Sequence, residues 1–424
     1  MFYMDKLVVQ GGKSLSGTVK ISGAKNAVLP VMAAAILADG EYELDNVPDL
    51  KDVRTMSKLL ESMGIKTETN QDKLKIFSSS PLSLEAPYEL VKTMRASIYV
   101  LGPLVARFGY AKVSLPGGCA WGPRPVNLHI EGLRKLNADI SIDKGYIVAK
   151  AGHLKGAHIS LDVPSVGATG NILMAACLAR GLTVIENAAK EPEIVALAEF
   201  LKSMGANISG EGTEHIEIEG VESLKPADCR IIPDRIEAAT YMVAAHITNG
   251  DVNIINMDPV HVSAVIDKLK DSGAEISIEN SSVNIKSSGR IKPVNITTAV
   301  YPGFPTDMQA QWMALMSVSS GSAIITDTIF HDRFTHVAEL KRLGADITLD
   351  NNVAVVKGVK GLSGAPVMST DLRASASLIL AALVAKGRTD ISRVYHLDRG
   401  YEKLEEKLNK LGAEIIREKE PIIT

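Results

Sequence analysis

The sequence is poor in cysteine, and its few cysteines form no recognisable pattern. The three cysteines, Cys119, Cys177 and Cys229, cannot all pair with one another, and their spacing matches no close metal-ligand motif. A chain of 424 residues can bury a large core without covalent cross-links. We therefore expect no disulfide framework, and a reducing, cytoplasmic environment suits the protein best.

No charge of either sign is in clear excess, and no apolar stretch is long. The 46 lysines and arginines nearly balance the 49 aspartates and glutamates, which leaves a net charge of −3. Proteins that bind nucleic acids or membrane surfaces usually carry a basic excess, so neither partner is expected. The longest apolar run, 27–38, contains Pro30 and is too short to span a membrane. Residues 1–7 lack the regions of a signal peptide, so membrane insertion is not expected either.

Several motifs of cofactor and metal enzymes are also missing. The sequence contains no Walker loop, no dinucleotide fingerprint and no serine elbow. Three histidines, His129, His331 and His396, stand near arginine-containing segments, but no pair has zincin spacing. We therefore predict no metal site.

What the sequence does contain is an internal repeat. Six divergent copies recur roughly every 70 residues, and each begins with an apolar helix of small residues that runs toward a glycine. A glycine just after a helix usually adopts the left-handed conformation that ends it. The expected helices and glycines are 25–37 with Gly40, 95–106 with Gly109, 168–179 with Gly181, 235–247 with Gly250, 307–318 with Gly321 and 373–385 with Gly387.

Each copy continues with a strand-like run, a second helix and a second strand. The second helix ends at a glycine in five copies and at an asparagine in the other, and asparagine is the common substitute that tolerates a left-handed conformation. These predicted caps are Gly64, Asn137, Gly205, Gly273, Gly344 and Gly412. The substitution of one left-handed residue for another supports the repeat.

The two kinds of helix differ in polarity. The first kind is apolar on nearly all sides, as in 173–179, and must be buried, whereas the second kind is amphipathic, as in 265–271. We therefore predict an α/β fold in which sheets and outer helices surround buried helices, with three copies in each of two domains. The domain boundary is expected near 220–234, and the first strand, 6–10, is expected to pair within the second domain.

The starts of the buried helices carry residues of chemical interest. A cation at a helix start opposes the helix dipole and costs up to about 1 kcal/mol. The residues that break this rule are Lys25, Arg95, Arg235 and Arg373. Because helix N-termini bind anions, a cleft lined by several of them would bind a small anion. Asp234 and Asp371 stand at two of the same helix starts, where simple capping is an equal alternative.

Arginines and one cysteine occupy further segments. The stretch 114–128 holds three prolines and three glycines around Cys119 and Arg124, so it must be a loop. Loops on rigid scaffolds carry function, although a turn-rich connector with an incidental cysteine is an equal alternative for this stretch alone. Arg333 and Arg399 follow later strands, and each alone is most often part of a surface ion pair.

Several segments together resemble one family. They are Ser-Gly-Ala-Lys-Asn at 22–26, Lys-Thr-Met-Arg-Ala-Ser at 92–97, Pro-Gly-Gly-Cys at 116–119 with Arg-Pro at 124–125, Phe-Pro-Thr-Asp-Met-Gln at 304–309, Asp-Leu-Arg-Ala-Ser-Ala at 371–376 and Asp-Arg-Gly-Tyr at 398–401. The chain resembles the enolpyruvyl transferases, in the branch that uses UDP-N-acetylglucosamine, over essentially its whole length. The resemblance implies a two-domain inside-out α/β barrel of six repeated units. It also implies that residues 22–232 form one domain and residues 1–21 plus 233–424 the other.

The resemblance further implies a reaction. Members transfer the enolpyruvyl group of phosphoenolpyruvate to the 3′-hydroxyl of UDP-N-acetylglucosamine and release phosphate, without a metal or organic cofactor, in the first committed step of peptidoglycan synthesis. Lys25, Arg124 and Arg399 would hold phosphoenolpyruvate, since bidentate arginine suits its carboxylate and phosphate. The other residues implied to bind substrate are Asn26, Arg95, Pro125, Val126, Asn127, Leu128, Ser165, Val166, Gly167, Asp307, Ile329, Arg333, Asp371 and Arg373.

Two residues would move the protons of this reaction, with Lys25 and Arg399 completing the catalytic set. Asp307 suits the base that accepts the proton of the attacking hydroxyl. Cys119 suits the donor to the methylene carbon, because a free thiol with a pKa of about 8.5 is mostly protonated near pH 7. By the same resemblance, Cys119 would be the site of a covalent adduct with phosphoenolpyruvate or the inhibitor fosfomycin. Cys177, within an apolar helix, is expected to be inert.

Two other interpretations stay open at this point. Enolpyruvylshikimate phosphate synthase shares the fold and uses phosphoenolpyruvate, although the Cys119 loop with Arg124 and Pro125 points away from it. The other alternative, from a different class, is a repeat protein that binds ligands without any chemistry.

Overall fold

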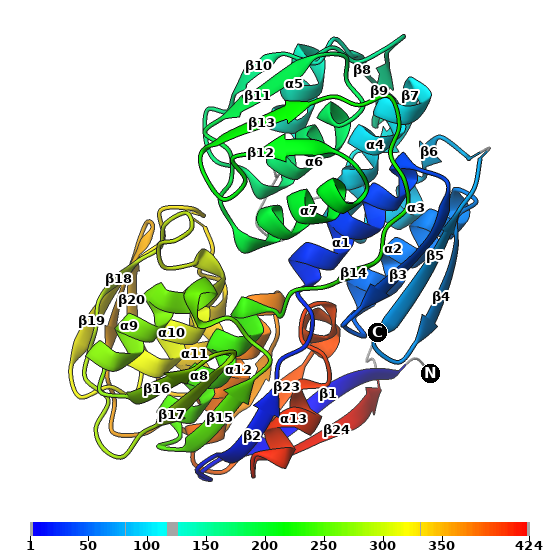
Figure 1. The fold of residues 1–424 in the computed structure, drawn as a ribbon. Coiled ribbons are helices and arrows are strands. Elements are labelled where there is room, and N and C mark those ends of the chain that lie inside the picture. The colour runs from blue at the N-terminus through cyan, green and yellow to red at the C-terminus, as the bar shows by residue number, and fades with distance from the viewer. Residues whose placement is uncertain (1–2, 81, 117–125, 331, 422–424) are drawn as a thin grey trace. The chain divides into compact units, whose positions relative to one another are not determined.

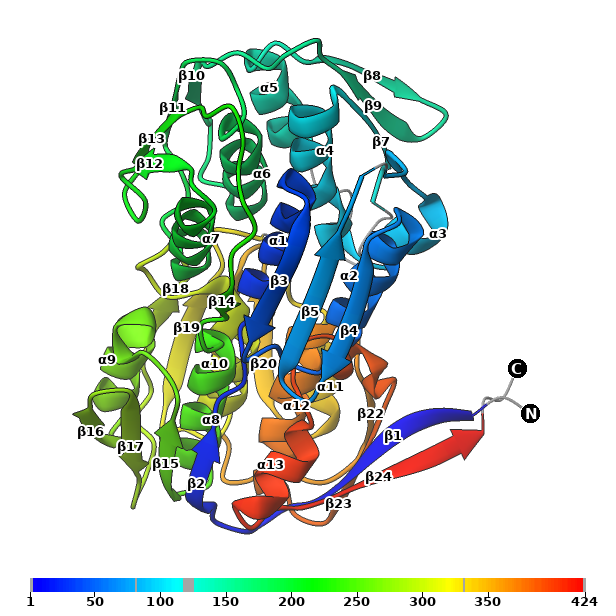
Figure 2. The same ribbon diagram turned by 45° about the vertical axis from the view of Figure 1, so that its right-hand side comes forward.

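The computed structural model describes residues 3–80, 82–116, 126–330 and 332–421. Its contacts divide the chain into two compact units, each with its own hydrophobic core. The continuous unit is Gly23–Ile232, and the split unit combines Met1–Ser22 with Pro233–Thr424. Figure 1 follows the chain from blue to red, and Figure 2 shows the same ribbon turned. The chain thus begins in the split unit, builds the continuous unit, and then completes the split unit.

Each unit contains three four-stranded sheets that share one pattern. In each sheet a short edge strand pairs in parallel with a central strand. On its other side the central strand pairs antiparallel with a third strand, and the third strand pairs antiparallel with the strand at the opposite edge. In the second copy the spatial order is β6 (Glu85–Ala86), β7 (Tyr110–Ser114), β9 (Tyr146–Lys150) and β8 (Asp139–Asp143). The recurrence of this order in every sheet confirms the predicted six-fold repeat.

The remaining sheets follow the same order. In the continuous unit they are β14 (Cys229–Arg230), β3 (Gly40–Asp45), β5 (Lys73–Ser78) and β4 (Lys66–Asn70), and then β10 (His158–Ser160), β11 (Leu182–Glu186), β13 (His215–Glu219) and β12 (Asn207–Ser209). In the split unit two sheets are β2 (Ser16–Lys20), β15 (Asp251–Ile255), β17 (Ser282–Lys286) and β16 (Glu275–Glu279), and β18 (Ile296–Thr297), β19 (Ser322–Thr326), β21 (Val353–Lys357) and β20 (Asp346–Asp350). The last sheet of the split unit is β22 (Pro366–Met368), β23 (Arg388–Ser392), β1 (Tyr3–Gln10) and β24 (Glu414–Pro421).

The first strand of the chain pairs with the last two. In β1, Leu7 lies opposite Ile391 of β23 and Arg417 of β24, in antiparallel register on both sides. Figure 2 shows β1 in blue beside β24 in red. The prediction that the first strand pairs within the second domain is therefore confirmed.

The interior of each unit consists of apolar helices. In the continuous unit they are α1 (Lys25–Ala34) with η1 (Ala35–Leu37), η2 (Arg95–Val100) with α4 (Leu101–Phe108), and α6 (Val166–Ala176). In the split unit they are α8 (Arg235–Ile247), η4 (Thr306–Met308) with α10 (Gln309–Met316), and α12 (Leu372–Val384). Every residue of α10 is buried, as is every residue of α6 from Ala168 to Ala176. Such helices must be enclosed on all sides, which is the predicted inside-out arrangement.

Amphipathic helices make up the second element of each copy. They are α2 (Lys51–Ser62), α5 (Asn127–Lys135), α7 (Pro192–Ser203), α9 (Ser263–Asp271), α11 (His336–Arg342) and α13 (Leu404–Lys410). The apolar face of α2, with Val53, Met56 and Leu60, is buried, while Arg54 and Lys58 on its other face are exposed. Each of the six second-helix caps has a positive φ, between 72° at Asn137 and 106° at Gly273, which confirms the predicted left-handed ends.

The prediction that a left-handed glycine ends each buried helix is confirmed only in part. Gly40, Gly109, Gly181 and Gly387 have positive φ, but Gly250 and Gly321 do not, so the cap prediction is wrong at these two glycines. Before Gly250 it is Asn249, with φ 51°, that takes the left-handed conformation. Gly250 is needed for another reason, because a Cβ there would lie 2.3 Å from the Leu15 carbonyl oxygen.

The second copy also starts its helix differently from the prediction. Residues 95–100 form the 3-10 helix η2 instead of an α-helix, and α4 begins only at Leu101. Pro103 explains the difference, because it has no N–H to donate to the carbonyl of Tyr99 and its ring would collide with that group in an α-helix. The chain before Pro103 therefore winds more tightly.

Candidate active site

In the split unit, predicted site residues converge on the carboxylate of Asp307. Asp307 lies in η4. Its Oδ2 accepts a hydrogen bond of 2.8 Å from Arg373 Nη2, and its Oδ1 lies 2.8 Å from Arg333 Nη1 in an ion pair. Both arginine side chains are almost buried, whereas about a quarter of the Asp307 side chain, 26%, is exposed. Pro305 is the N-cap residue of η4, and among the described hydrogen bonds none joins the Asp307 side chain to the helix backbone. The structure thus brings three predicted substrate-binding residues into one charged cluster.

The two arginines set the charge state of Asp307. Burial alone would raise the pKa of this carboxyl, but the guanidinium groups of Arg373 and Arg333 outweigh burial and hold the pKa well below its usual range. Asp307 is therefore ionised near pH 7. In this arrangement it is a strong hydrogen-bond acceptor and a weak base.

Asp371 positions Arg373 from the start of α12. Its Oδ1 accepts hydrogen bonds from the backbone N–H groups of Arg373, at 2.8 Å, and Ala374, at 3.1 Å. Asp234 caps α8 in the same way, through Ile236 and Glu237. The capping alternative is therefore confirmed for both aspartates.

Asp327, which sequence reasoning missed, joins two parts of this cluster. Its side chain is fully buried, and Oδ1 accepts hydrogen bonds from Thr298 Oγ1 at 2.8 Å and from the backbone N–H groups of Ile329 and Phe330 at 2.9 Å. Its Oδ2 accepts a hydrogen bond of 2.8 Å from Thr306 Oγ1, and Thr306 Oγ1 in turn accepts one from Arg333. Asp327 therefore ties predicted site residue Ile329 to the turn that carries Asp307.

A signal for Asp327 was present in the repeat. The residue that follows the central strand is an asparagine with positive φ in three other copies. Each of these asparagines donates a hydrogen bond to a backbone carbonyl of a neighbouring segment. These residues are Asn46, Asn187 and Asn256. In the fifth copy an aspartate stands at this place, which replaces an amide donor with a carboxylate acceptor. Alignment of the copies would have shown an aspartate where three other copies have asparagine.

Arg399 ends the 3-10 helix η5 (Val394–Arg399). Its neighbour Asp398 forms a two-pronged ion pair with Arg417 of β24, at 2.8 and 3.0 Å, and Arg417 also binds Glu405 at 2.6 Å. The ion-pair interpretation of this segment therefore holds for Asp398. The pairing fixes the end of η5 to a strand, and with it the backbone of Arg399.

In the continuous unit, Lys25 begins α1, with Asn26 exposed beside it. The Nζ atom of Lys25 lies 3.5 Å from Oδ2 of Asp52, whose side chain is 5% exposed. An internal carboxylate therefore offsets part of the unfavourable interaction between this cation and the helix dipole, as Asp307 does for Arg373. For these two residues, a cation at a helix start is weaker evidence for a bound anion than the sequence suggested.

A neutral pair links three other predicted segments of this unit. Asn171 of α6 accepts a hydrogen bond of 2.7 Å from the Gly102 N–H and donates to the Ile98 carbonyl at 2.9 Å and to His129 Nδ1 at 3.0 Å. His129 follows the predicted residues Val126, Asn127 and Leu128 on α5. Burial and nearby Arg95 lower the pKa of His129 to about 3, so the ring is neutral.

The same histidine lies against the start of α6. Ser165 caps this helix by accepting a hydrogen bond from the Ala168 N–H at 3.3 Å, and Val166 and Gly167 form its first turn. A Cβ on Gly167 would lie 3.0 Å from His129 Nε2, so any other residue there would require the histidine ring to shift. Residues near Arg95, near Leu128 and at 165–167 are therefore held together, whereas Cys119, Arg124 and Pro125 lie outside the described residues.

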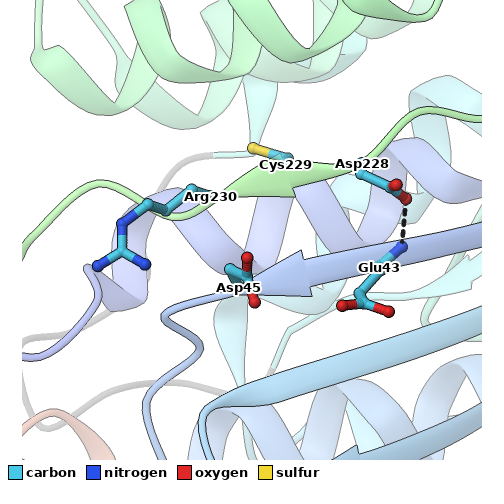
Figure 3. A pocket seen from close by; sticks show the side chains of 5 residues that line it. All are labelled: Glu43, Asp45, Asp228, Cys229 and Arg230. Carbon is cyan, nitrogen blue, oxygen red and sulfur yellow. Dashed lines mark hydrogen bonds between the residues drawn. The ribbon is translucent and has the colours of Figure 1, made fainter.

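The two described cysteines are not activated. Burial raises the pKa of Cys177 to about 12 and that of Cys229 to about 11. Cys229 lines a shallow hollow with Glu43, Asp45, Asp228 and Arg230, in which Asp228 accepts a 2.8 Å hydrogen bond from the Glu43 N–H (Figure 3). No predicted site residue lines this hollow. Both thiols stay protonated near pH 7, which agrees with the predicted inertness of Cys177.

Two further observations concern the described part of the chain. It contains no group of three or more histidine, cysteine, aspartate or glutamate side chains that could hold a metal ion. None of its helices combines the length and apolar character needed to cross a membrane.

Comparison with known proteins identifies the family. A family model described as EPSP synthase (3-phosphoshikimate 1-carboxyvinyltransferase) matches residues 9–408. The UDP-N-acetylglucosamine 1-carboxyvinyltransferase of Myxococcus xanthus (strain DK1622) is 57% identical over 419 residues, which cover 98% of this chain and 100% of the relative. The protein of the same name from Geobacter metallireducens (strain ATCC 53774 / DSM 7210 / GS-15) is 57% identical over 417 residues, with the same coverage. The chain belongs to the enolpyruvyl transferase family.

The fold of this enolpyruvyl transferase agrees with a solved member. The crystal structure of the enolpyruvyl transferase NikO from Streptomyces tendae matches with a TM-score of 0.89 at 27% identity, covering 99% of this chain and 100% of that one. The predicted family and the predicted inside-out α/β barrel are therefore both confirmed.

Proposed function

We propose that this enolpyruvyl transferase moves the enolpyruvyl group of phosphoenolpyruvate onto the 3′-hydroxyl of UDP-N-acetylglucosamine and releases phosphate. The observation that carries the proposal is the name shared by its relatives, which are 54–57% identical over 98% or more of this chain. The runner-up activity, with shikimate 3-phosphate as acceptor, has the support of the family model's description alone.

The proposal assigns the cations to the anionic substrate. Lys25, Arg124 and Arg399 hold the carboxylate and phosphate of phosphoenolpyruvate, because charge-assisted hydrogen bonds to these groups are strong and directional. The nucleotide sugar takes its contacts from the other predicted binding residues. Two observations support this division: the starts of η2, α5 and α6 are tied together through His129 and Asn171, and Ile329 is tied to the turn of Asp307.

Asp307 orients the attacking hydroxyl and accepts its proton. The low pKa of Asp307 makes it a weak base toward a free alcohol. The hydroxyl becomes far more acidic as its oxygen bonds to C2 of phosphoenolpyruvate, so a weak base can accept the proton in the same step. The exposed quarter of the Asp307 side chain leaves room for this contact.

Cys119 donates the other proton, to C3 of phosphoenolpyruvate, and a tetrahedral intermediate forms. The bond between C2 and the phosphate oxygen then breaks, phosphate leaves, and a proton passes from C3 back to the Cys119 thiolate, which restores both the enol ether and the thiol. Arginine and lysine groups stabilise the negative charge on the phosphate as it departs. No step requires a metal ion or an organic cofactor.

Phosphate release tests the reaction directly. The protein should release phosphate from phosphoenolpyruvate when UDP-N-acetylglucosamine is present and not when either substrate is omitted. Shikimate 3-phosphate serves as the matched acceptor for the runner-up activity. Release with shikimate 3-phosphate alone would replace our proposal with the runner-up, and no release with either acceptor would leave a protein that only binds.

The role of Cys119 has its own test. A carboxylic acid can donate a proton but reacts poorly with an epoxide, so Cys119→Asp should keep measurable turnover and escape inactivation by fosfomycin. Cys119→Ala should lose most turnover. Intact-mass spectrometry of the unsubstituted protein should show one fosfomycin adduct on the peptide with Cys119. An adduct on Cys177 or Cys229 would contradict the assignment.

The cellular role follows from the reaction. Both substrates are phosphorylated metabolites of the cytoplasm, and we place the enzyme there. The product would enter peptidoglycan synthesis, so loss of the enzyme would affect cell wall biogenesis and, through the wall, cell shape and division.

A further inference from the structure

A buried polar network lies directly behind Asp307 in the split unit. Its centre is Tyr401, which belongs to the Asp-Arg-Gly-Tyr segment of the sequence and is only 2% exposed. The Tyr401 hydroxyl lies 3.2 Å from Arg373 Nη1, 3.1 Å from Gln311 Nε2 and 2.9 Å from Thr240 Oγ1. These partners come from the three inner helices, α12, α10 and α8. One phenol therefore connects all three.

With the amide nitrogen of Gln311 facing Tyr401, the main hydrogen bonds of this network have consistent directions. Arg373 and the amide nitrogen of Gln311 can only donate, so the Tyr401 oxygen accepts from both. The Tyr401 proton must then go to Thr240 Oγ1, and the Thr240 proton goes to the Ile236 carbonyl, 2.7 Å away. In this arrangement a chain of donors runs from the guanidinium through Tyr401 and Thr240 to the backbone of α8.

Arg373 spans the distance between this chain and the carboxylate. Its Nη1 donates to Tyr401 while its Nη2 donates to Asp307 Oδ2 at 2.8 Å. A planar guanidinium held at both ends has a single orientation. Burial keeps the phenol neutral by raising the pKa of Tyr401, although Arg373 acts against this. Tyr401 therefore acts as a fixed acceptor for one arm of Arg373.

We propose that Tyr401 is a positioning residue for the transfer reaction, because its hydroxyl fixes the Arg373 guanidinium and through it the carboxylate of Asp307. The inference rests on the proposed function in one respect, the role of Asp307. Arg333 provides an internal control, since it pairs with Asp307 at the same 2.8 Å distance but has no contact with Tyr401 among its described hydrogen bonds.

The chain also offers a matched tyrosine. Tyr241 of α8 is buried to a similar degree, but its hydroxyl has no hydrogen-bond partner among the described residues. Tyr401→Phe and Tyr241→Phe remove the same atom from the interior of the same unit. We expect Tyr401→Phe to lower kcat about tenfold or more, while the Kd for UDP-N-acetylglucosamine stays within about twofold. Tyr241→Phe should change neither quantity.

Double substitutions separate positioning from general loosening of the core. If Tyr401 acts through Arg373, Tyr401→Phe should have little further effect on kcat in an Arg373→Lys background. In an Arg333→Lys background the full tenfold loss should remain. Equal losses in both backgrounds, or a kcat within twofold in Tyr401→Phe alone, would overturn the proposal. If Tyr401→Phe does not fold, Thr240→Val removes the acceptor of the Tyr401 proton and should give a smaller loss with the same dependence on Arg373.

A measurement without substrate keeps this proposal separate from the proposed function. Rotation of the Arg373 guanidinium about its Nε–Cζ bond, measured by NMR on arginine-labelled protein, should be slow in the unsubstituted protein and in Tyr241→Phe. It should become fast in Tyr401→Phe. Fast rotation in the unsubstituted protein would overturn the positioning role of Tyr401 even if phosphate is released. Slow rotation that becomes fast in Tyr401→Phe would support this role even if the acceptor of the enolpyruvyl group were a different alcohol.

Discussion

In the split unit the inner helices enclose an ionised network, whereas in the continuous unit they enclose a neutral one. Asp307 and Arg373 carry opposite charges at the centre of the former, and Asn171 and His129 are uncharged at the centre of the latter. Desolvating a charge costs several kcal/mol unless partners compensate, so a buried ion pair is retained mainly where it serves a purpose. A neutral amide that bonds backbone groups costs much less to bury. The hydrogen bonds between inner helices thus centre on a neutral pair in one unit and on an ion-paired cluster in the other, while the Lys25–Asp52 ion pair of the continuous unit lies at the start of α1.

The largest expected difference between the two networks concerns the stability of the fold when one amide side chain is replaced. Asn171→Leu leaves the Gly102 N–H and His129 Nδ1 without their partner and removes one of the two hydrogen bonds that the Ile98 carbonyl accepts, so it should lower the free energy of unfolding by about 2 to 3 kcal/mol. Gln311→Leu in the split unit should cost about 1 kcal/mol or less, because the Gln311 Oε1 is already without a partner among the described residues. Urea unfolding measures both, and equal costs would break the comparison.

The next effect is on catalysis. Asp307→Ala should lower turnover by about 10²-fold, the usual contribution of a positioned base, and should leave binding of UDP-N-acetylglucosamine detectable. Asp307→Asn serves as a control that keeps the shape of the side chain and removes its charge. Since Asp307 is not a helix cap, near-normal turnover would leave it with only the ion pairs to Arg333 and Arg373, and the ionised network would then be purely structural.

A pH dependence follows from two histidines in opposite environments. Burial lowers the pKa of His246 in the split unit to about 4, while hydrogen bonds to Glu217 and Glu186 raise the pKa of exposed His215 in the continuous unit. Unfolded histidine has a pKa of about 6.5. As the pH falls from 6.5 toward 4, unfolding therefore lets His246 take up a proton, and its contribution to stability is lost. His215 gains stability as the pH falls through its raised pKa.

Replacing each histidine should reveal these signs. Below pH 6.5, His246→Gln should make stability fall less steeply, by up to about 1.4 kcal/mol per pH unit. His215→Gln should leave the slope below pH 6.5 unchanged, and should instead remove the gain in stability that occurs above pH 6.5, as the pH falls through the raised pKa of His215. Urea midpoints between pH 8 and 5 provide the measurement, and a steeper fall in His246→Gln would contradict the assigned neutral state.

The smallest effect concerns a feature that the two units share. Gly205 in the continuous unit and Gly344 in the split unit have φ of 104° and 94°, and a Cβ on either would meet nothing within 4 Å. Gly→Ala should cost about 1 kcal/mol at both positions, and Gly→Asn less, because asparagine tolerates this conformation at Asn137. A difference between the two units in thermal unfolding would show that the caps are not equivalent.

Much of the fold could be predicted because its signals are local. Runs of apolar residues indicate the buried helices, and a residue that tolerates the left-handed conformation ends each second helix. Both kinds of helix can therefore be predicted from neighbouring residues in the sequence. Gly250 shows the limit, since its role depends on the Leu15 carbonyl, which lies far away in the sequence. The 3-10 helix η2 could have been predicted from Pro103, because a proline prevents the α-helical hydrogen bond to the residue four positions earlier.

The candidate site was less predictable for the same reason. The sequence placed Asp307, Arg333 and Arg373 among the substrate-binding residues through a family resemblance, but nothing local indicated that the two arginines share the carboxylate of Asp307. Asp327 was missed because its role lies in bonds to residues on two other elements. The positions proposed to contact substrate, including Cys119, stay predictions until they are tested.

The pairing of β1 with β23 and β24 has a consequence during synthesis of the chain. The continuous unit has all its strands once residue 232 has left the ribosome, whereas β1 must wait for residues 388–421 before its hydrogen bonds can form. During that interval β1 is a strand without neighbours, which favours wrong pairing and aggregation. We therefore expect the continuous unit to fold first during translation, and chains truncated before β23 to be captured by chaperones through the segment that was made earliest.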